Sequence, residues 1–401
     1  MADGIATLIS SVGLTQETFL VFCILAVLVV GAVVVIITSR PILDIYPYLN
    51  PSARVRARKG RLFDEKQISE LVETNDVEEV ENYLKGVSEY ADVLDEYPLD
   101  KALDVERANT YDFVARLAPK DIKDPFVVMS KKADIDNIKS LLTSKEVGLT
   151  SDETRELLIP CGSLYDDLES LADAESVTDI ISSLDNTEYA AVLEDALPQY
   201  EDTNMILPLE SALDKYYLGK LLHSSDVPSD ENKQILYAYV GTQVDVTNLK
   251  LIIRAKQDDL DYDAISPYIL EEGYQLREWK LKDLMESPDV TNVVSGLEGT
   301  KYAEVLSDVI PVYNETGSVA VFEKALDVYA SEYSKSLAVK KPLGIGPIIG
   351  YLNQKENEIK NLKIIARAKR EADFPNSKIM EMLIWVQSQL WVILTLFQDL
   401  D

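Results

Sequence analysis

Four aspartates close together are the residues whose types and spacing could most readily perform chemistry. Asp258, Asp259, Asp261 and Asp263 lie in the stretch QDDLDYDA, and clustered carboxylates can hold a calcium ion. The stretch lacks the ligand spacing and the glycine of an EF-hand loop. We therefore interpret it as a solvated acidic loop.

The other candidates for chemistry are isolated residues. His223 is the single histidine, so the sequence offers neither a set of Ser-His-Asp triads nor a histidine-rich zinc site. Gly344, Gly346 and Gly350 are spaced somewhat like a dinucleotide-binding loop, but they follow Pro342 and no predicted strand, which favours a turn between helices. The sequence therefore predicts a protein that is not an enzyme and that holds no metal or cofactor.

Two groups of basic residues could contact a partner. Arg54, Arg56 and Arg58 lie in ARVRARKGR (53–61) and could face a membrane or a membrane protein. The second group lies on helical faces, with two members at i and i+4 in each of two copies of a motif: Lys250, Arg254, Lys363 and Arg367. Binding of acidic partner groups and ordinary solvation both remain open for them. The formal net charge of -30 repels nucleic acid, so no nucleic-acid partner is expected.

The elements that carry these residues occur three times. The Asn-Lys motif reads DIDNIKSLLTSK (134–145), DVTNLKLIIRAK (245–256) and EIKNLKIIARAK (358–369). Its asparagines Asn137, Asn248 and Asn361 are separated by 111 and 113 residues. We expect each of them to bond to a neighbouring helix or cap, since buried polar side chains are usually hydrogen-bonded; a ligand role is the alternative.

Two further motifs accompany each Asn-Lys motif. The tyrosine motif reads VENYLKGVSEYADVL (80–94), IISSLDNTEYAAVL (180–193) and VVSGLEGTKYAEVL (293–306), and the Ala-Leu-Asp motif reads PLDKALD (98–104), PLESALD (208–214) and VFEKALD (321–327). Their apolar residues recur with helical spacing. Ser287 followed by Pro288 predicts the start of one of these helices.

These patterns predict an all-α body of three small helical domains related by internal duplication. We place the repeats at residues 67–165, 166–278 and 279–385. Units of this length exceed those of short solenoid repeats.

An uncharged stretch of 19 residues, Phe19 to Ile37, is long enough to cross a bilayer. Residues 1–18 contain no Lys or Arg, which favours a retained membrane helix over residues 19–38 rather than a cleaved signal peptide. The basic juxtamembrane segment at 39–66 predicts that the body is cytoplasmic and that residues 1–18 lie outside the cell membrane. Residues 386–401 read either as an amphipathic helix or as an extension without fixed structure.

The segment YPYLNPSARVRARKGRLF (46–63), together with the triplicated motifs, resembles the C subunit of archaeal-type (A-type/V-type) ATP synthases over residues 46–384. The resemblance implies a funnel of three pseudo-threefold-related helical domains. It implies a non-catalytic rotor component, the counterpart of the d subunit in the vacuolar pump. The implied partners are the proteolipid ring and the central-shaft subunits D and F, and the predicted membrane helix adds the lipid bilayer.

Two points stand beside this resemblance. Repeat architecture alone also permits a membrane-anchored helical adaptor of another membrane complex. The membrane helix departs from the family pattern, in which many members have none, and we interpret it as a tether that threads the hole of the proteolipid ring.

Overall fold

The computed structural model describes residues 16–87, 89–225, 230–371 and 373–384. The first 15 residues of the predicted external terminus and the tail 386–401 lie outside the described residues. The chain divides into two units, residues 1–49 and residues 50–401.

The long helix α2 (Gln16–Lys59) carries the apolar stretch. Its part Ile24–Lys59 is the one helix among the described residues that is long and apolar enough to cross a membrane. Large apolar side chains such as Val27, Leu28 and Ile37 are more than half exposed. By length and composition, the helix is a candidate membrane span at the predicted place.

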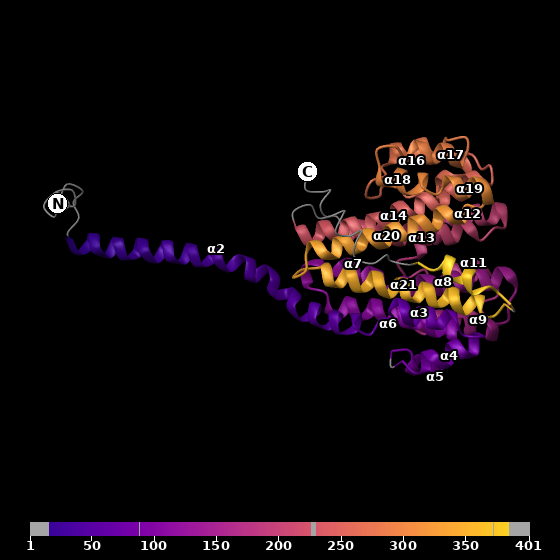
Figure 1. Cartoon of the computed structure of the whole chain (residues 1–401), viewed down its shortest axis with the longest axis horizontal. Coiled ribbons are helices and arrows are strands. Elements are labelled where there is room, and N and C mark those ends of the chain that lie inside the picture. The colour runs from indigo at the N-terminus through magenta and orange to yellow at the C-terminus, as the bar shows by residue number, and fades with distance from the viewer. Residues whose placement is uncertain (1–15, 88, 226–229, 372, 385–401) are drawn as a thin grey trace. The chain divides into compact units, whose positions relative to one another are not determined.

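Six helices of the second unit form a closed cycle in which each packs against the next (Figure 1). In order they are α6 (Leu99–Leu117), α7 (Lys123–Ser130), α13 (Leu207–Ser225), α14 (Glu231–Gln257), α20 (Ala320–Lys340) and α21 (Gly346–Ala368), and α21 packs back on α6. A further helix, α8 (Lys132–Val147), follows α7 almost directly.

The first Asn-Lys motif lies in α8, the second in α14 and the third in α21. Each of these helices packs against two short helices at the start of the next copy of the motifs, where the first copy counts as the next after the third. The pairs are α10 (Tyr165–Ser170) and α11 (Val177–Ser183) on α8, α16 (Glu278–Met285) and α17 (Val290–Gly296) on α14, and α3 (Glu65–Val72) and α4 (Val77–Lys85) on α21.

Short helices complete the second unit. They are α5 (Ala91–Glu96), α9 (Ser151–Leu157), α12 (Ala190–Thr203), α15 (Tyr262–Ile265), α18 (Lys301–Ser307), α19 (Ile310–Thr316), α22 (Asn376–Met382) and the 3-10 turns η1 (Lys120–Ile122), η2 (Leu171–Asp173) and η3 (Ser266–Tyr268). The described residues contain no strand, only an isolated bridge between Glu272 and Arg277, so the all-helical prediction is confirmed.

The hydrophobic cores join stretches that are distant in sequence. One core combines residues 68–103 with residues 359–383, and another runs from Val246 to Ala330. In both, the Asn-Lys motif of one copy packs with the tyrosine and Ala-Leu-Asp motifs of the next copy. The repeat boundaries at 165/166 and 278/279 stay a sequence prediction, and the cores are assembled across these boundaries.

The tyrosines of the tyrosine motif are almost fully buried: Tyr90, Tyr189 and Tyr302. The predicted helix start at Ser287 and Pro288 is wrong. Helix α17 begins at Val290, and Asp289 caps it by accepting a 2.8 Å hydrogen bond from the Asn292 N–H. A carboxylate at this position caps the helix and also interacts with its positive end.

Candidate functional site

The three motif asparagines make the same pair of hydrogen bonds to the backbone of a later residue. The Asn137 amide donates to the Ile159 carbonyl (2.8 Å) and accepts from the Ile159 N–H (2.7 Å). Asn248 does the same with Leu270, and Asn361 with Ile384. All three asparagines are buried. The predicted structural role of the asparagines is therefore confirmed, and their partners are backbone segments rather than ligands.

The motif lysines pair with the aspartates of the Ala-Leu-Asp motif in the next copy. Lys139 reaches Asp214 at 2.7 Å, and Lys250 reaches Asp327 at 2.6 Å. Lys363 of the last copy reaches Asp104 of the first, also at 2.6 Å. The three pairs therefore run head to tail and close on themselves.

The acidic residue that opens each motif holds the segment leading into the next group of short helices. Asp134 accepts from the Leu164 N–H, Asp245 from the Gln275 and Leu276 N–H groups, and Glu358 from the Phe63 N–H. All three carboxylates are buried. We call each set of acid, asparagine and lysine a clasp: Asp134, Asn137 and Lys139 form the first, Asp245, Asn248 and Lys250 the second, and Glu358, Asn361 and Lys363 the third.

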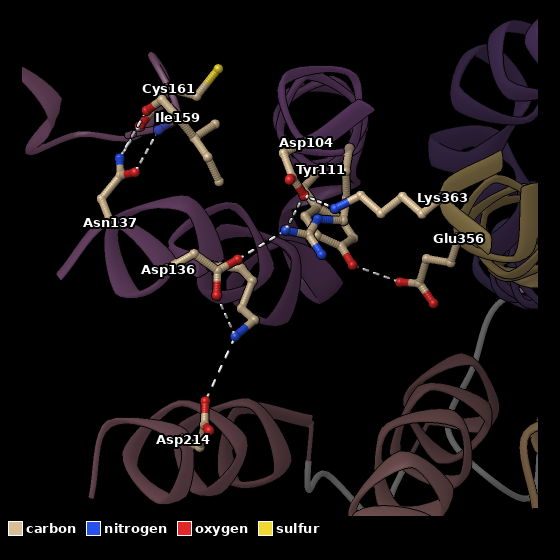
Figure 2. Close-up of polar contacts among 11 residues, drawn as sticks. Asp104, Tyr111, Asp136, Asn137, Ile159, Cys161, Asp214, Glu356 and Lys363 are labelled. Carbon is tan, nitrogen blue, oxygen red and sulfur yellow. Dashed lines mark hydrogen bonds and ion pairs between the residues drawn. The ribbon is translucent and has the colours of Figure 1, made fainter. Parts of the chain in front are cut away.

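The first and third clasps meet in a shared ion-pair network (Figure 2). Arg107 contacts both Asp104 (2.8 Å) and Asp136 (3.0 Å), and Lys132 links Asp136 (2.8 Å) to Asp214 (3.7 Å). Carboxylates and cations alternate here, so the series of ion pairs runs from α21 through α6 and α8 to α13. Networks of this kind hold their members in place better than isolated surface pairs.

Beside this network, the Tyr111 hydroxyl donates to Glu356 of α21 at 2.8 Å (Figure 2). The Tyr239 hydroxyl of α14 donates to the same carboxylate at 3.4 Å. Glu356 thus joins three helices of the closed cycle.

An open groove of about 540 Å³ borders the first and third clasps. Arg107, Lys139 and Lys363 line it together with the exposed apolar side chains of Val147 and Leu157. A groove with this mixed lining suits a protein segment better than a small molecule, because it is open and combines apolar side chains with fixed charges.

The predicted interface residues of the Asn-Lys helices are mostly occupied within the chain. Lys250 and Lys363 belong to clasps, and Arg254 pairs with Glu323 of the next Ala-Leu-Asp motif. Arg367 is exposed. An interface role for these four residues stays a prediction. The aspartates that pair with the motif lysines, Asp104, Asp214 and Asp327, were not predicted, although the aspartate ends every copy of its motif.

The three arginines predicted to face a membrane or a membrane protein also contact the chain itself. The Arg58 guanidinium lies 3.8 Å from the centroid of the Phe113 ring, and that of Arg54 lies 5.8 Å from it. Arg56 donates to the Pro342 carbonyl at 2.7 Å. Arg54 and Arg56 remain exposed, so a membrane-facing role for them stays a prediction.

The residues first considered for chemistry serve helix ends and turns. Asp261 caps α15, and His223 is an exposed residue in the last turn of α13. Gly346 begins α21 where a Cβ atom would lie 2.1 Å from the Ala338 carbonyl, so only glycine fits this turn between helices. In the described part of the chain, no group of three acidic, histidine or cysteine side chains is arranged to hold a metal ion.

We expect Asn248→Ala to destabilise the protein by about 2–4 kcal/mol, because the Leu270 N–H and carbonyl would lose their partners while buried. Thermal and urea unfolding of the full chain in detergent would measure the loss. Asn292→Ala removes an exposed asparagine and serves as the control, with a much smaller expected effect. Equal effects of the two substitutions would contradict the role given to the asparagine.

Lys250→Glu should lower the free energy of unfolding by about 1–3 kcal/mol, because it places two carboxylates together at a half-buried site. The exchanged pair Lys250→Glu with Asp327→Lys should recover part of the loss. A double-mutant cycle measured by urea unfolding checks this. Lys66→Glu, in an exposed pair on one helix, is the control and should have little effect. A cycle without coupling would show that the Lys250–Asp327 pair is unimportant.

Burial raises the pKa of Asp245 to about 6, although hydrogen bonds from Gln275 and Tyr302 favour its ionised form. The folded state then binds a proton more tightly than the unfolded state, so stability should rise as the pH falls from about 7 to about 4, by up to about 3 kcal/mol. Asp245→Asn should lack this part of the pH dependence. Unfolding of both proteins at matched pH values tests it, and identical pH profiles would contradict it.

Comparison with known proteins extends these observations. The family model of the ATP synthase (C/AC39) subunit matches residues 51–382. A protein of Methanobrevibacter smithii, named as the C subunit of an A-type ATP synthase, is 76% identical over 384 residues, which cover 96% of this chain and 100% of the relative.

More distant relatives carry the same name. The protein of Methanothermobacter thermautotrophicus is 52% identical over 96% of this chain and 100% of its own length. That of Pyrococcus abyssi is 30% identical over 84% of this chain and 90% of its own length. The chain therefore belongs to the ATP synthase (C/AC39) subunit family.

Proposed function

We propose that this chain is a non-catalytic rotor component of an A-type ATP synthase. In this role it couples a membrane proteolipid ring to a central shaft of subunits D and F, so that ion translocation drives ATP synthesis. The helical body lies on the cytoplasmic side as three domains that form a funnel around a pseudo-threefold axis. The relatives' shared name supports the assignment to this complex.

The closed cycle of clasps is the observation that carries the mechanical part of the proposal. A protein that transmits torque must keep its shape while force enters at one face and leaves at another. In an open chain of domains, the two end domains would each be held on one side only. Here Lys363 pairs with Asp104 and Glu358 accepts from the Phe63 N–H, so every copy of the motifs is fixed to both neighbours.

The groove beside the first and third clasps is a candidate contact for the shaft. Its lining mixes basic residues, Arg107, Lys139 and Lys363, with acidic residues, Asp104, Asp136 and Glu210. A bound segment with complementary charges would take a defined orientation on this lining. The acidic remainder of the body would repel anionic lipid and keep the rotating part free of the membrane.

Helix α2 supplies the link to the membrane in this proposal. Beyond the predicted span of 19–38, it still exposes Ile42, Leu43, Tyr46 and Leu49. Eleven further residues of helix, at about 1.5 Å each, carry this apolar surface some 16 Å past the hydrocarbon boundary. A protein partner that extends beyond the hydrocarbon core would cover it, and in this proposal that partner is the wall of the ring's central hole.

Purification of the tagged full chain from native membranes, with the co-purifying proteins identified by mass spectrometry, tests the proposed function. Proteolipid and shaft proteins should co-purify. Recovery of a different membrane complex without them would replace the proposal with the helical adaptor.

Deletion of residues 1–40 should reduce the amount of proteolipid retained while leaving shaft binding intact, because the two contacts lie on different parts of the chain. Replacement of residues 19–38 by leucines is the matched control, since it restores membrane insertion without the native surface. Unchanged retention after the deletion would rule out α2 as the tether. Full retention with leucines would show that the helix anchors only to lipid.

A further inference from the structure

A second set of polar contacts accompanies the clasps, and it is unequal. Three residues before the acid of each clasp lies Lys131, Thr242 or Lys355, and directly before the tyrosine of each tyrosine motif lies Glu188, Lys301 or Glu89. In the first and third copies these two positions therefore carry opposite charges. In the second they carry a hydroxyl and a lysine.

In the first clasp, Lys131 pairs with Glu188, which Lys220 also contacts. Burial opposes ionisation of Glu188, but hydrogen bonds from Lys131, Lys220 and Tyr216 lower its pKa to about 2. This carboxylate is therefore firmly ionised. The pair ties the start of α8 to the loop before α12 by charge-assisted hydrogen bonds, which are stronger than neutral ones.

In the third clasp, Lys355 lies in a buried cluster of charges. Its ammonium group is 3.0 Å from Glu358, 3.4 Å from Glu106 and 3.5 Å from Glu89. The Tyr90 hydroxyl donates to Glu358 at 2.5 Å. The Lys355 side chain is about 1% exposed, so removal of Lys355 would leave buried carboxylates without this cation.

The second clasp has only neutral donors at the corresponding place. Thr242 is fully buried, while the side chain of Lys301 points into solvent and its backbone N–H donates to the Gln275 side chain. Asp245 accepts from backbone N–H groups and from the Tyr302 hydroxyl. Among the described residues, no lysine or arginine nitrogen lies within ion-pair distance of this buried carboxylate.

We infer that the joint at the second clasp, between α14 and the short helices α16–α18, is the place where the closed cycle of clasps opens first. The first and third joints each hold an additional cation close to the acid of the clasp, and the second does not. The second joint has a further pair, Arg254 with Glu323, but its arginine is exposed and such a pair contributes little. Opening of the second joint also returns Asp245 to water, which favours the open state, because an ionised carboxylate is costly to bury without a cation.

Hydrogen exchange of the full chain in detergent, resolved on peptides by mass spectrometry, tests this inference. The substitutions Thr242→Lys and Lys301→Glu together copy the ion pair of the other joints into the second. They should slow exchange in α16–α18 by about fivefold to tenfold, with little change in α3–α4 or α10–α11.

The matched control removes the pair where it exists. Lys131→Thr with Glu188→Lys gives the first joint the residues of the second, and exchange in α10–α11 should become faster by a similar factor. Circular dichroism and the unfolding temperature establish that each variant is folded. If the first variant does not fold, the wild-type protein and the second variant decide the question.

Slower wild-type exchange in α16–α18 than in both α10–α11 and α3–α4 would overturn the inference. So would exchange in α10–α11 that is insensitive to loss of the Lys131–Glu188 pair. Neither result depends on the proposed rotor function, because the measurement uses the isolated chain.

Discussion

The body depends on polar contacts between segments that are distant in sequence and buried where they meet. Each motif asparagine gives its amide and its carbonyl to one backbone residue, so it replaces on both sides the hydrogen bonds that water would make. A backbone segment outside helices and strands needs such partners for its N–H and carbonyl groups when it is buried. Hydrophobic packing supplies most of the stabilisation around it, but this pair of bonds fixes which segment is packed against which helix.

The lysine and the acid of each clasp add direction to this attachment. The lysine reaches the Ala-Leu-Asp helix of the next copy, while the acid holds the loop that leads into the next short helices. Because the two point to different parts of the same neighbour, rotation of one copy against the next would break at least one of them. The last copy pairs with the first, as in Lys363 and Asp104, and so no copy in the second unit is left at an open end.

The sequence allowed the helical class, the triplication and the buried faces to be predicted, because these follow from the spacing of apolar residues within each helix. Tyr90, Tyr189 and Tyr302 are buried as their spacing requires. The partners of Lys139, Lys250 and Lys363 could not be predicted in this way. A motif shows which residues share a helix face, whereas the neighbour of that face is set by how the copies are threaded. The repeated aspartate was a usable signal, since a lysine and an aspartate that recur together three times suggest a pair.

The same threading explains why cores and repeats do not coincide. An Asn-Lys helix such as α14 or α21 is long. Its first half packs against other helices of the closed cycle, and its second half packs in a hydrophobic core. Helix α21 thus supplies one wall of a core whose other walls come from residues 68–103. During synthesis on a ribosome, those early helices would emerge with an uncovered apolar face and wait for some 250 further residues before their partner leaves the exit tunnel. The nascent chain therefore has a long interval in which this core is incomplete. Protection from aggregation by a chaperone would matter most during that interval.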